Sequence, residues 1–408
     1  MRVLHILGCN LNSGAGRGTY SLHSALNKLG INSRIYTNSI RTINDNQVCY
    51  TAITNSAMIL KAIRKRLDKA ITFFYHNKED RIFSSGIFGI DLTKTIEYKE
   101  ADIIHMHWVN GGFINIKHLS KINKPIIWTM RDMWPMTGGC HYSISCNKYM
   151  HKCGKCPQLK SNCYFDLSRL VINRKDQYIP EGIKLVGISE WLSNIARKSY
   201  LFNDYDIRTI SNNIDTQDFF QIQKKTAQNN LGIQTGKKII LCGAINLKNS
   251  FKGFEKFIDA LKQLDARKYF LCFFGKQDES ILARLGFEYK NFGYLDNNDA
   301  LRMAYNSADV FVAPSLIEAF GKTIAESMAC GTPVVCFDTS GPKDIISHQI
   351  DGYLAEPFKS NDLARGINWL LNTENYEKIC RNARKKIISK FDSKIIAEKY
   401  IKLYEEVL

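Results

Sequence analysis

The sequence predicts an α/β protein made of two doubly wound, Rossmann-like domains. Short apolar runs rich in β-branched residues alternate with amphipathic helical stretches, which is typical of parallel sheets built from βαβ units. The runs are almost continuously apolar, as expected of strands that helices cover on both faces. The alternation restarts after a polar stretch at about 203–236. We therefore expect a first domain at 1–207, a second at 208–392, and a last helix at about 393–408 that packs back on the first domain.

Eight apolar runs are expected to form strands. The first, VLHIL at 3–7, is followed by a glycine-rich turn and a helical pattern from Thr19 to Leu29. The other seven stand between helical patterns and have the same apolar character. They are ADIIHMHW at 101–108, PIIWTM at 125–130, IKLVGIS at 183–189, KKIILCG at 237–243, YFLCFFG at 269–275, ADVFVAP at 308–314 and TPVVCF at 332–337.

The chain is basic, and its charge is uneven. Its net charge is +17 over 408 residues, and its apolar content of 45% is ordinary for a soluble globular protein. Residues 1–207 hold 28 Lys and Arg against 15 Asp and Glu, whereas 208–408 hold 28 against 24. The surplus points to an anionic partner, such as a phospholipid surface or a phosphorylated substrate, or to solubility alone. Because no recognition motif for nucleic acid accompanies the charge, we expect no nucleic-acid partner.

The sequence carries no recognisable membrane or export segment. The start, MRVLHILGCN, lacks the long apolar region and the cleavage site of a secretory signal. No run of 18 apolar residues occurs that could span a bilayer. We therefore expect a cytoplasmic protein.

Two loops after predicted strands suit a phosphate-bearing ligand, because ligands of open α/β sheets bind at the carboxyl ends of the strands. NSGAGRGTYS at 12–21 has glycines that let a ligand approach the backbone and a helix start that attracts anions. A tight strand-to-helix turn explains the same glycines. Lys248 and Lys252, within 243–257, precede a helix and suit a diphosphate, although solvated loop lysines explain them equally.

A third such loop holds two glutamates in the otherwise apolar stretch IEAFGKTIAES. Glu318 is expected in the loop after the strand ADVFVAP, and Glu326 about two turns into the next helix. At the start of that helix, the N–H groups of Phe320, Gly321 and Lys322 are expected to form a phosphate cradle. A carboxylate is the usual acceptor for ribose hydroxyls, so one glutamate suits a ribose and the other a sugar.

The stretch SLIEAFGKTIAESMACGTPVV resembles the donor-site signature of retaining glycosyltransferases of the GT-B fold, family 4, whose E-x7-E spacing Glu318 and Glu326 meet. The resemblance extends to KG at 252–253, to SGPKDIISHQIDGYL at 340–354 and to the GAGRG loop. DIIHMHWVNGGF and PIIWTMRDMWPMTGGCHY resemble the subgroup that builds capsules, exopolysaccharides and the O-antigen chains of lipopolysaccharide. The resemblance covers nearly the whole chain. It implies two domains facing each other across a cleft, with the donor held by the second domain and the acceptor by the first.

The resemblance also implies residue roles. Glu326 would bind the donor ribose and Glu318 the transferred sugar, while Lys252 and the N–H groups after Glu318 would neutralise the diphosphate. Gly16 and Arg17 would close over the phosphates. Retention would proceed by front-face attack, with the departing phosphate taking the acceptor proton and with no metal or other cofactor in catalysis. The donor-binding residues are then Gly16, Arg17, Lys248, Lys252, Glu318, Ala319, Phe320, Gly321, Lys322 and Glu326, and the catalytic residues Glu318, Lys252 and Arg131.

Two positions depart from the pattern of these relatives. Arg131 stands where many carry a histidine, and Ala244 where many carry an arginine. Arg131 cannot act as a base, being always charged, but it can orient the donor or an acceptor phosphate. Lys248 can replace the missing arginine. His107 and Asp132 are expected on the acceptor side, with a packed core histidine as the alternative for His107.

A cysteine cluster follows, in CHYSISCNKYMHKCGKC. A C-x2-C pair with two more cysteines nearby predicts, in a cytoplasmic chain, a structural Zn²⁺ site that fixes a loop beside the cleft. The C-x5-C arm is wider than in a standard zinc knuckle. Disulfides and unlinked thiols therefore stay open as alternatives, and His141, His151 and Cys163 as substitute ligands. The four expected ligands are Cys140, Cys146, Cys153 and Cys156.

Residues 57–75, AMILKAIRKRLDKAITFFY, are expected to form a helix that contacts a membrane surface. An apolar face is flanked by basic residues, which is the pattern of an interfacial helix. An ordinary helix packed on the sheet of the first domain is the alternative. The apolar face consists of Ile59, Ile63, Leu67, Ala70 and Phe74, and the basic residues are Lys61, Arg64, Lys65 and Lys69.

Together these features predict a hexosyltransferase that is peripheral on the inner face of the cell membrane. It would move a hexose-type sugar from a UDP- or GDP-linked donor to a lipid-linked or oligosaccharide acceptor in surface polysaccharide synthesis. Two alternatives remain: a GT-B nucleotide-sugar epimerase, and a catalytically inactive subunit that binds a nucleotide-sugar or a partner protein.

Overall fold

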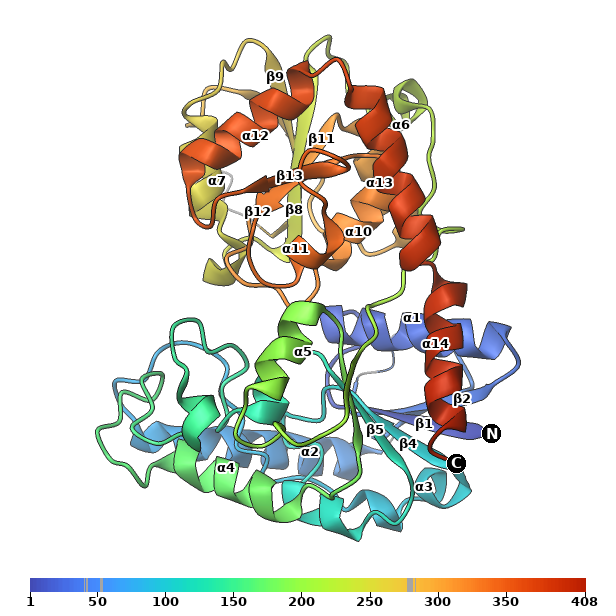
Figure 1. The fold of residues 1–408 in the computed structure, drawn as a ribbon, viewed down its shortest axis with the longest axis vertical. Helices are drawn as coiled ribbons and strands as arrows, with labels where there is room; N and C mark the ends of the chain where they lie inside the picture. The colour runs from blue at the N-terminus through green and yellow to red at the C-terminus, as the bar shows by residue number, and fades with distance from the viewer. Residues whose placement is uncertain (40, 42, 52–53, 277–281, 283) are drawn as a thin grey trace. The chain divides into compact units, whose positions relative to one another are not determined.

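The computed structural model describes the whole chain except residues 40, 42, 52–53, 277–281 and 283 (Figure 1). It divides into two compact units. Unit 1 comprises Met1–Ser211 with Ile396–Leu408, and unit 2 comprises Asn212–Ile395. Ser211, where the first segment of unit 1 ends, is four residues beyond position 207, the expected end of the first domain.

Unit 1 contains a seven-stranded parallel sheet of the order β3-β2-β1-β4-β5-β6-β7. This is the strand order of a doubly wound Rossmann sheet, extended by one strand. The strands are β1 (Arg2–Leu7), β2 (Asn32–Thr37), β3 (Val48–Tyr50), β4 (Ile103–Met106), β5 (Ile126–Met130), β6 (Lys184–Gly187) and β7 (Ile207–Thr209).

Helices and short 3-10 turns connect these strands. The longest are α1 (Gly14–Lys28), α2 (Asn55–Ala70) and α4 (Leu167–Tyr178). The remaining described ones are α3 (Ile96–Glu100), α5 (Glu190–Arg197), η1 (Ile71–Phe74), η2 (Leu92–Lys94), η3 (Ile116–Lys121), η4 (Trp134–Met136) and η5 (Lys148–His151).

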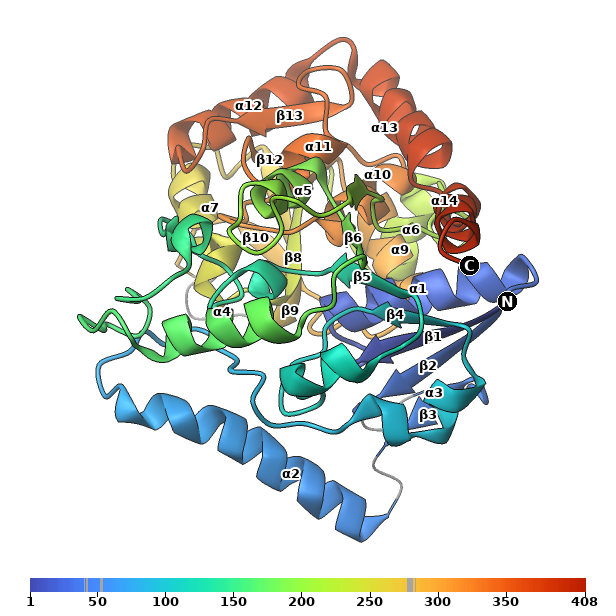
Figure 2. The ribbon, with the colours of Figure 1, turned by 60° about the horizontal axis from the view of Figure 1, so that its bottom comes forward.

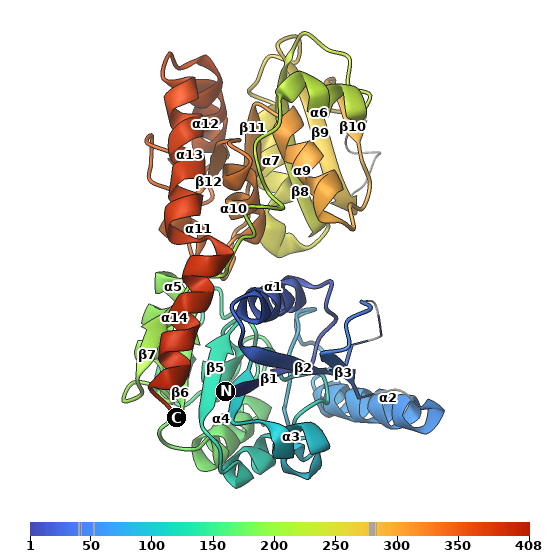
Figure 3. The same cartoon turned by 90° about the vertical axis from the view of Figure 1, so that its right-hand side faces the viewer.

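Helix α14 (Ser393–Glu405) carries the chain back onto the sheet of unit 1. Its residues Ile396, Tyr400 and Leu403 share a core with Leu22 and Leu26 of α1 and with residues of β1, β4, β5 and β6. Helices α1 and α14 therefore cover the same face of the sheet. Figure 3 shows both helices together with the strands of unit 1.

Unit 2 repeats the doubly wound plan with a six-stranded parallel sheet of the order β10-β9-β8-β11-β12-β13. Its core combines these strands with residues of α7 and α12. The strands are β8 (Lys238–Asn246), β9 (Tyr269–Lys276), β10 (Glu288–Asn291), β11 (Val310–Ala313), β12 (Val334–Phe337) and β13 (Gly352–Ala355). The described helices are α6 (Lys224–Asn230), η6 (Ser250–Lys252), α7 (Phe254–Leu261), α9 (Asn298–Ser307), α10 (Lys322–Ala329), α11 (Pro342–Ile345), α12 (Ser360–Asn372) and α13 (Tyr376–Lys390).

The predicted fold class is confirmed, and each of the eight expected runs contains a strand. One boundary was wrong. The helix expected from Thr19 begins at Gly14, because the Ser13 side chain caps it by accepting a hydrogen bond from the Gly16 N–H. The glycines of GAGRG therefore lie in the first turns of α1 and not in a separate loop. In the described part of the chain, no helix combines the length and hydrophobicity needed to cross a bilayer.

Candidate functional site

The strongest candidate site lies at the carboxyl edge of the unit 2 sheet, where three loops meet. The loop after β8 ends in η6 and Gly253, and the loop after β11 carries Glu318. The Leu316 N–H donates to the Phe251 carbonyl at 2.8 Å and so ties these two loops together. The Glu318 N–H donates to Ser340 Oγ at 3.1 Å, which adds the turn before α11.

Two glycines allow this close packing. A Cβ at Gly253, where φ is +63°, would lie 2.0 Å from the Pro314 carbonyl oxygen. Gly321, with φ at +105°, is the N-cap residue of α10 and takes a left-handed conformation that other residues rarely adopt. Gly253 thus packs against the start of the loop that carries Glu318, and Gly321 stands at the end of that loop.

Lys252 and Glu318 form an ion pair at this edge. Lys252 is the last residue of η6, and Glu318 stands between β11 and α10, so the pair joins two of the loops. About 29% of the lysine side chain and 25% of the glutamate side chain are exposed. A ligand can therefore reach both charged groups at once.

The start of α10 lies next to this ion pair in the sequence. The first turn of a helix leaves N–H groups without intrahelical partners and carries a partial positive charge, which favours a phosphate. Ala319 and Phe320 have buried side chains, with Phe320 against the ring of Phe391 at 5.8 Å between centroids. Of these two predicted donor-binding residues, only the backbone can face a ligand. The Lys322 side chain is half-buried.

The Glu326 side chain is more deeply buried than the sequence pattern indicated. It has no solvent exposure, and its carboxylate accepts a hydrogen bond from Tyr305 Oη at 3.1 Å. Tyr305, on α9, is also fully buried. A ribose can reach this carboxylate only after neighbouring side chains have moved.

Two further positions of unit 2 differ in exposure: Ala244, where many relatives carry an arginine, and the predicted donor-binding residue Lys248. Ala244 lies within β8 with 7% of its surface exposed. Lys248 is exposed in the loop after β8, and its N–H donates to Asn246 Oδ1 at 3.0 Å. Lys248 is thus near the strand end, as expected, but on a surface loop.

In unit 1, Gly16 and Arg17 lie in the first turn of α1. A Cβ at Gly16 would lie 2.1 Å from the Asn10 carbonyl oxygen, so only glycine fits there. Gly16 is buried and Arg17 half-buried. The tight-turn interpretation therefore accounts for Gly16, and a phosphate contact by either residue stays a prediction.

Arg131 and His107 belong to a buried polar network at the carboxyl ends of β4 and β5. Arg131 donates from its guanidinium to His107 Nδ1 at 3.1 Å, and the other His107 nitrogen lies 2.9 Å from His5 Nδ1. His105 bonds Thr129 and Tyr404 through its two ring nitrogens, at 2.8 and 2.7 Å. His107 is 2% exposed, so the structure agrees with the alternative of a packed core histidine.

His5, His105 and His107 are the three potential metal-ligating residues whose ligand atoms lie within 4.8 Å of one another in the described part of the chain. A cation is disfavoured there. Both ring nitrogens of His105 are already hydrogen-bonded, and the Arg131 guanidinium is 3.1 Å from His107. Burial, the neighbouring histidines and Arg131 hold the pKa of His5 and of His107 well below the usual value, and burial and Arg131 do the same for His105. The cluster is therefore a network of neutral imidazoles.

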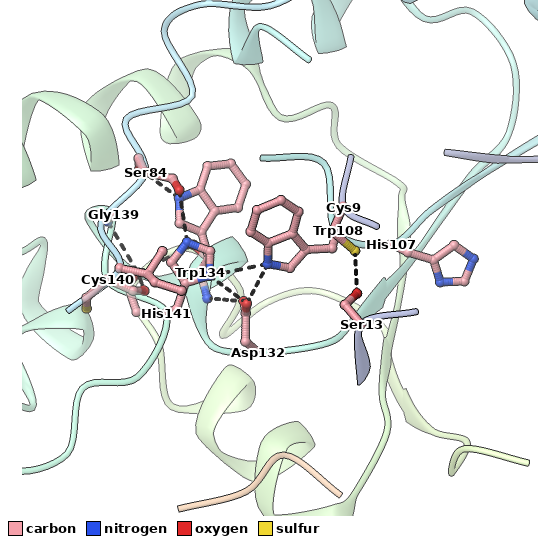
Figure 4. Close-up of polar contacts among 12 residues, drawn as sticks. Cys9, Ser13, Ser84, His107, Trp108, Asp132, Trp134, Gly139, Cys140 and His141 are labelled. Carbon is pink, nitrogen blue, oxygen red and sulfur yellow. Dashed lines mark hydrogen bonds and ion pairs between the residues drawn. The ribbon is translucent and has the colours of Figure 1, made fainter. Parts of the chain in front are cut away.

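Asp132 is the centre of a second network, shown in Figure 4. Its carboxylate accepts from Trp108 Nε1 at 2.9 Å and from the Trp134 N–H at 2.9 Å, and lies 2.6 Å from His141 Nδ1. His141 Nε2 is 2.9 Å from Ser84 Oγ. Figure 4 shows the His107 ring pointing away from this group.

Ser84, His141 and Asp132 thus follow the order of a Ser-His-Asp triad. All three are at most 7% exposed, and Asp132 has two tryptophan donors in addition to the histidine. A substrate cannot reach Ser84 in this arrangement. The network holds the segment after β5 in place, and any acceptor contact by Asp132 stays a prediction.

The four cysteines predicted as metal ligands lie together. Their side chains line one small cavity beside Phe83 and Ser168. All twelve cysteines of the chain are free thiols, so the disulfide alternative is not formed in this structure. His141 is engaged with Asp132 and Ser84, which removes it as a substitute ligand.

Comparisons with known proteins identify the family of the domain that carries this candidate site. Residues 223–387 match the family described as glycosyl transferases group 1, so unit 2 carries a domain of that family. An uncharacterized glycosyltransferase of Methanocaldococcus jannaschii is 26% identical over 336 residues, which cover 78% of this chain and 77% of the relative. The N,N'-diacetylbacillosaminyl-diphospho-undecaprenol alpha-1,3-N-acetylgalactosaminyltransferase of Campylobacter jejuni is 30% identical over 204 residues, 48% of this chain and about half, 53%, of the relative.

The fold comparison covers both units. The sucrose-phosphate synthase of Thermosynechococcus elongatus superposes with a TM-score of 0.72 over 99% of each chain at 17% sequence identity. At this identity the likeness concerns the fold alone. With the family match, it shows that the chain is a GT-B protein with a group 1 glycosyltransferase domain, and the resemblance is confirmed at that level.

Sequence reasoning missed three contributors to these sites. Tyr305 contacts Glu326 from 21 positions away, and no local pattern indicates that contact. Ser340 was quoted within a motif but not singled out, although its hydroxyl orients the Glu318 backbone. His5 lies on a strand whose apolar run gave no reason to expect a partner for it.

Proposed function

We propose that the protein is a retaining, metal-independent glycosyltransferase of family 4 that uses a UDP- or GDP-linked hexose. The observation that carries this proposal is the Lys252–Glu318 ion pair beside the start of α10. At one sheet edge, a cation and the N–H groups of a helix start suit the diphosphate of a nucleotide-sugar, and a carboxylate suits the hydroxyls of its sugar.

The donor would lie along this edge with its diphosphate at the start of α10. Lys252 would neutralise the leaving diphosphate, and Glu318 would accept hydrogen bonds from hydroxyls of the transferred sugar. Electrostatic stabilisation of the departing charge is usually the largest catalytic contribution. Because Lys252 already contacts Glu318, its ammonium would both orient the carboxylate and neutralise the diphosphate.

In the reaction, the bond from the anomeric carbon to the diphosphate oxygen breaks while the acceptor hydroxyl attacks the same face. The acceptor proton passes to the departing phosphate, so no base from the protein is required. Arg131, which is buried at the end of β5 in unit 1, is always charged and would not serve as such a base. Arg131 and Asp132 would act on the acceptor side indirectly, by positioning the side chains to which they are hydrogen-bonded.

A lipid-linked or oligosaccharide acceptor in surface polysaccharide synthesis is the acceptor class that we propose. The Campylobacter jejuni relative is named for a diphospho-undecaprenol acceptor, which supports this class. An acceptor with a polyprenyl chain stays in the membrane, so the enzyme must work at a membrane surface.

Helix α2 supports such a location at the cytoplasmic face of the membrane. Its apolar residues point outward: Ile59 is 60% exposed, and Phe73 and Phe74 in the following turn are 71% and 83% exposed. Figure 2 shows α2 at the periphery of unit 1. Single exposed apolar residues are normal, but a continuous apolar face on one helix marks an interaction surface.

Two polar residues of α2 face unit 1 instead. Asp68 is 3% exposed and accepts a hydrogen bond from the Ser85 hydroxyl, and the Lys61 ammonium donates to the Asn38 carbonyl. Burial lowers the pKa of Lys61 from its usual value. This exposure favours the interfacial helix over the alternative of an ordinary helix packed on the sheet of the first domain. We propose that its apolar face, with the exposed Lys65, Arg66 and Lys69, inserts into an anionic phospholipid surface.

Donor binding and turnover test the enzymatic proposal. Purified protein should be stabilised against heat by UDP or GDP and by one set of their sugars, with slow donor hydrolysis when no acceptor is present. Stabilisation without hydrolysis or transfer would favour the inactive subunit. Conversion of the donor to an epimer would favour the epimerase. No stabilisation by either nucleotide would overturn the proposal.

A further inference from the structure

We propose that Cys140, Cys146, Cys153 and Cys156 together hold one structural Zn²⁺ ion in unit 1. Four sulfur ligands are the commonest set for a structural zinc site. The site is separate from the donor edge of unit 2, and it does not depend on the proposed enzymatic function.

The four sulfur-bearing side chains converge on one cavity from distant parts of a long connection between β5 and α4. The cavity has a volume of about 20 Å³, which is room for a single water molecule or ion. The four cysteines supply the potential metal ligands of its wall, beside Phe83, Tyr149 and Pro157. Of the described residues that line it, none is a histidine or a carboxylate, so the donor set is purely sulfur.

The C-x2-C pair lies on a tight turn that brings two of the sulfurs to one side. Cys153, Gly154 and Lys155 all have positive φ, at 51°, 102° and 45°. For Cys153 and Lys155 this conformation is uncommon and costs free energy unless the surroundings enforce it. A Cβ at Gly154 would lie 2.5 Å from the Tyr164 carbonyl oxygen, so the turn requires glycine there.

Helix α4 enforces this turn. Ser168 Oγ accepts a hydrogen bond from the Gly154 N–H at 3.0 Å, and Asp166 Oδ2 accepts from the Cys156 N–H at 2.7 Å. Asp166 is also the N-cap residue of α4. Helix α4 therefore holds Cys153 and Cys156 in place before any ion binds, which lowers the entropic cost of metal binding.

A buried cation completes the surroundings. Lys175 is fully buried, donates to the Thr137 carbonyl at 2.8 Å, and interacts electrostatically with Cys140 and Cys153. Four thiolates and one Zn²⁺ carry a net charge of about −2. The ammonium of Lys175, which also interacts with the Asp132 carboxylate, opposes that charge.

The ion would draw the sulfurs together. Among the described residues, His5, His105 and His107 are the group whose ligand atoms all lie within 4.8 Å of one another, and no three of the cysteines form such a group. The cysteine sulfurs are therefore farther apart than in a site that holds a metal ion. Zn–S bonds are about 2.3 Å long, so binding would require rotations of these side chains, which already line one cavity. His151 and Cys163, the other substitute ligands, are exposed.

Metal content and cobalt spectroscopy on the full-length, tag-free protein test this site. Protein purified under reducing conditions should contain about one Zn²⁺ per chain, released when four thiols are titrated with a mercurial reagent. Exchange for Co²⁺ should give intense visible bands of a tetrahedral ion and strong thiolate-to-cobalt charge transfer. This spectrum reports four sulfurs without any substitution, so it does not depend on the folding of a variant.

Two matched substitutions locate the ion. Cys153→Ser should lose most of the zinc, and Cys163→Ser, in the same segment but outside the cavity, should keep about one ion per chain. Absence of zinc with four reactive thiols, a cobalt spectrum of nitrogen or oxygen ligands, or equal zinc in both variants would overturn the proposal. A disulfide among the four cysteines in protein isolated without reductant and lacking metal would overturn it as well.

Discussion

The Lys252 ammonium forms an ion pair with the Glu318 carboxylate across 66 positions of the chain. Both side chains remain about a quarter exposed, so the attraction between them is screened by water and contributes little to stability, on the order of 0.2–1 kcal/mol. A pair of this kind at a sheet edge is better explained by a ligand that needs both charges. The predictions for the two residues therefore concern binding and turnover and not folding.

Glu318→Ala should leave the affinity for UDP or GDP nearly unchanged and mainly lower the transfer rate. The proposed partner of Glu318 is the transferred sugar, which the free nucleotide lacks, and removing the carboxylate leaves Lys252 free to bind phosphate. Calorimetric titration with nucleotide, together with the rate of sugar transfer, separates these effects. A loss of nucleotide affinity as large as that of a Glu326 variant would contradict the assignment.

Lys252→Ala should do the opposite. It removes a charge-assisted contact to the diphosphate, which is expected to cost about 1.5–3 kcal/mol, or roughly a 10- to 100-fold loss of nucleotide affinity. Lys268→Ala is a matched control, because this lysine is exposed directly before β9, at the opposite edge of the same sheet. Equal losses in both variants would mean that general charge, and not the Lys252 position, attracts the nucleotide.

Glu326→Ala should weaken the binding of free nucleotide roughly 10- to 100-fold, because a ribose contact is present without the sugar. The structure adds a second expectation. Glu326 is fully buried and accepts from Tyr305, so the substitution should also lower thermal stability. Tyr305→Phe removes only this hydrogen bond and serves as the control. If Glu326→Ala loses stability but binds nucleotide normally, Glu326 is a structural residue.

The strand pattern could be predicted only where strands are central. The eight expected runs are central or nearly so, with neighbours on both sides and continuous apolar sequence. The edge strands β3, β7, β10 and β13 were not predicted. They are three or four residues long and pair on one side only, so a long apolar run is not required of them. β2 was also missed, because its burial alternates and its sequence, NSRIYT, is largely polar.

For the sites, the sequence indicated which residue types lie near strand ends, but it did not indicate how deeply each side chain is buried. Glu318 and Lys252 follow strands within short motifs, so both could be placed at the sheet edge. Glu326 and His107 also lie near strand ends, yet both are buried, because contacts from residues far along the chain decide how deep a side chain lies. The spacing of the cysteines, in contrast, was sufficient to bring all four to one cavity, since they lie within a single connection.

The outward apolar face of α2 yields a prediction about membranes. Periodicity predicted an amphipathic helix, but it could not tell which face points away from the protein. Lys61 and Arg64 prove to be half-buried, so the informative substitution is at the exposed Lys65, Arg66 and Lys69. Changing these three residues to Gln should weaken binding to anionic vesicles roughly 100-fold, at about 1 kcal/mol for each charge.

Two comparisons make that result specific. Changing Arg381, Lys385 and Lys390 to Gln removes three charges from the exposed surface of α13 and should leave vesicle binding nearly intact. Ile59→Ser with Phe74→Ser should weaken binding even to vesicles in high salt, because apolar insertion is not screened. Equal binding by wild type and the Lys65/Arg66/Lys69 variant would refute the interfacial role of α2.

Acid should destabilise unit 1 through its buried histidine network. His5, His105 and His107 have pKa values well below the usual 6.5, chiefly because burial penalises the charged form. Below pH 6.5 the unfolded chain therefore binds up to three protons that the native state does not, and the free energy of unfolding falls as pH falls, by at most about 4 kcal/mol per pH unit. Thermal unfolding between pH 7.5 and 5 should show this decline, and His5→Gln should reduce its slope by about one proton. The exposed His76→Gln should leave the slope unchanged. A wild-type Tm that stays constant from pH 6.5 to 5 would mean that the network accepts protons without opening.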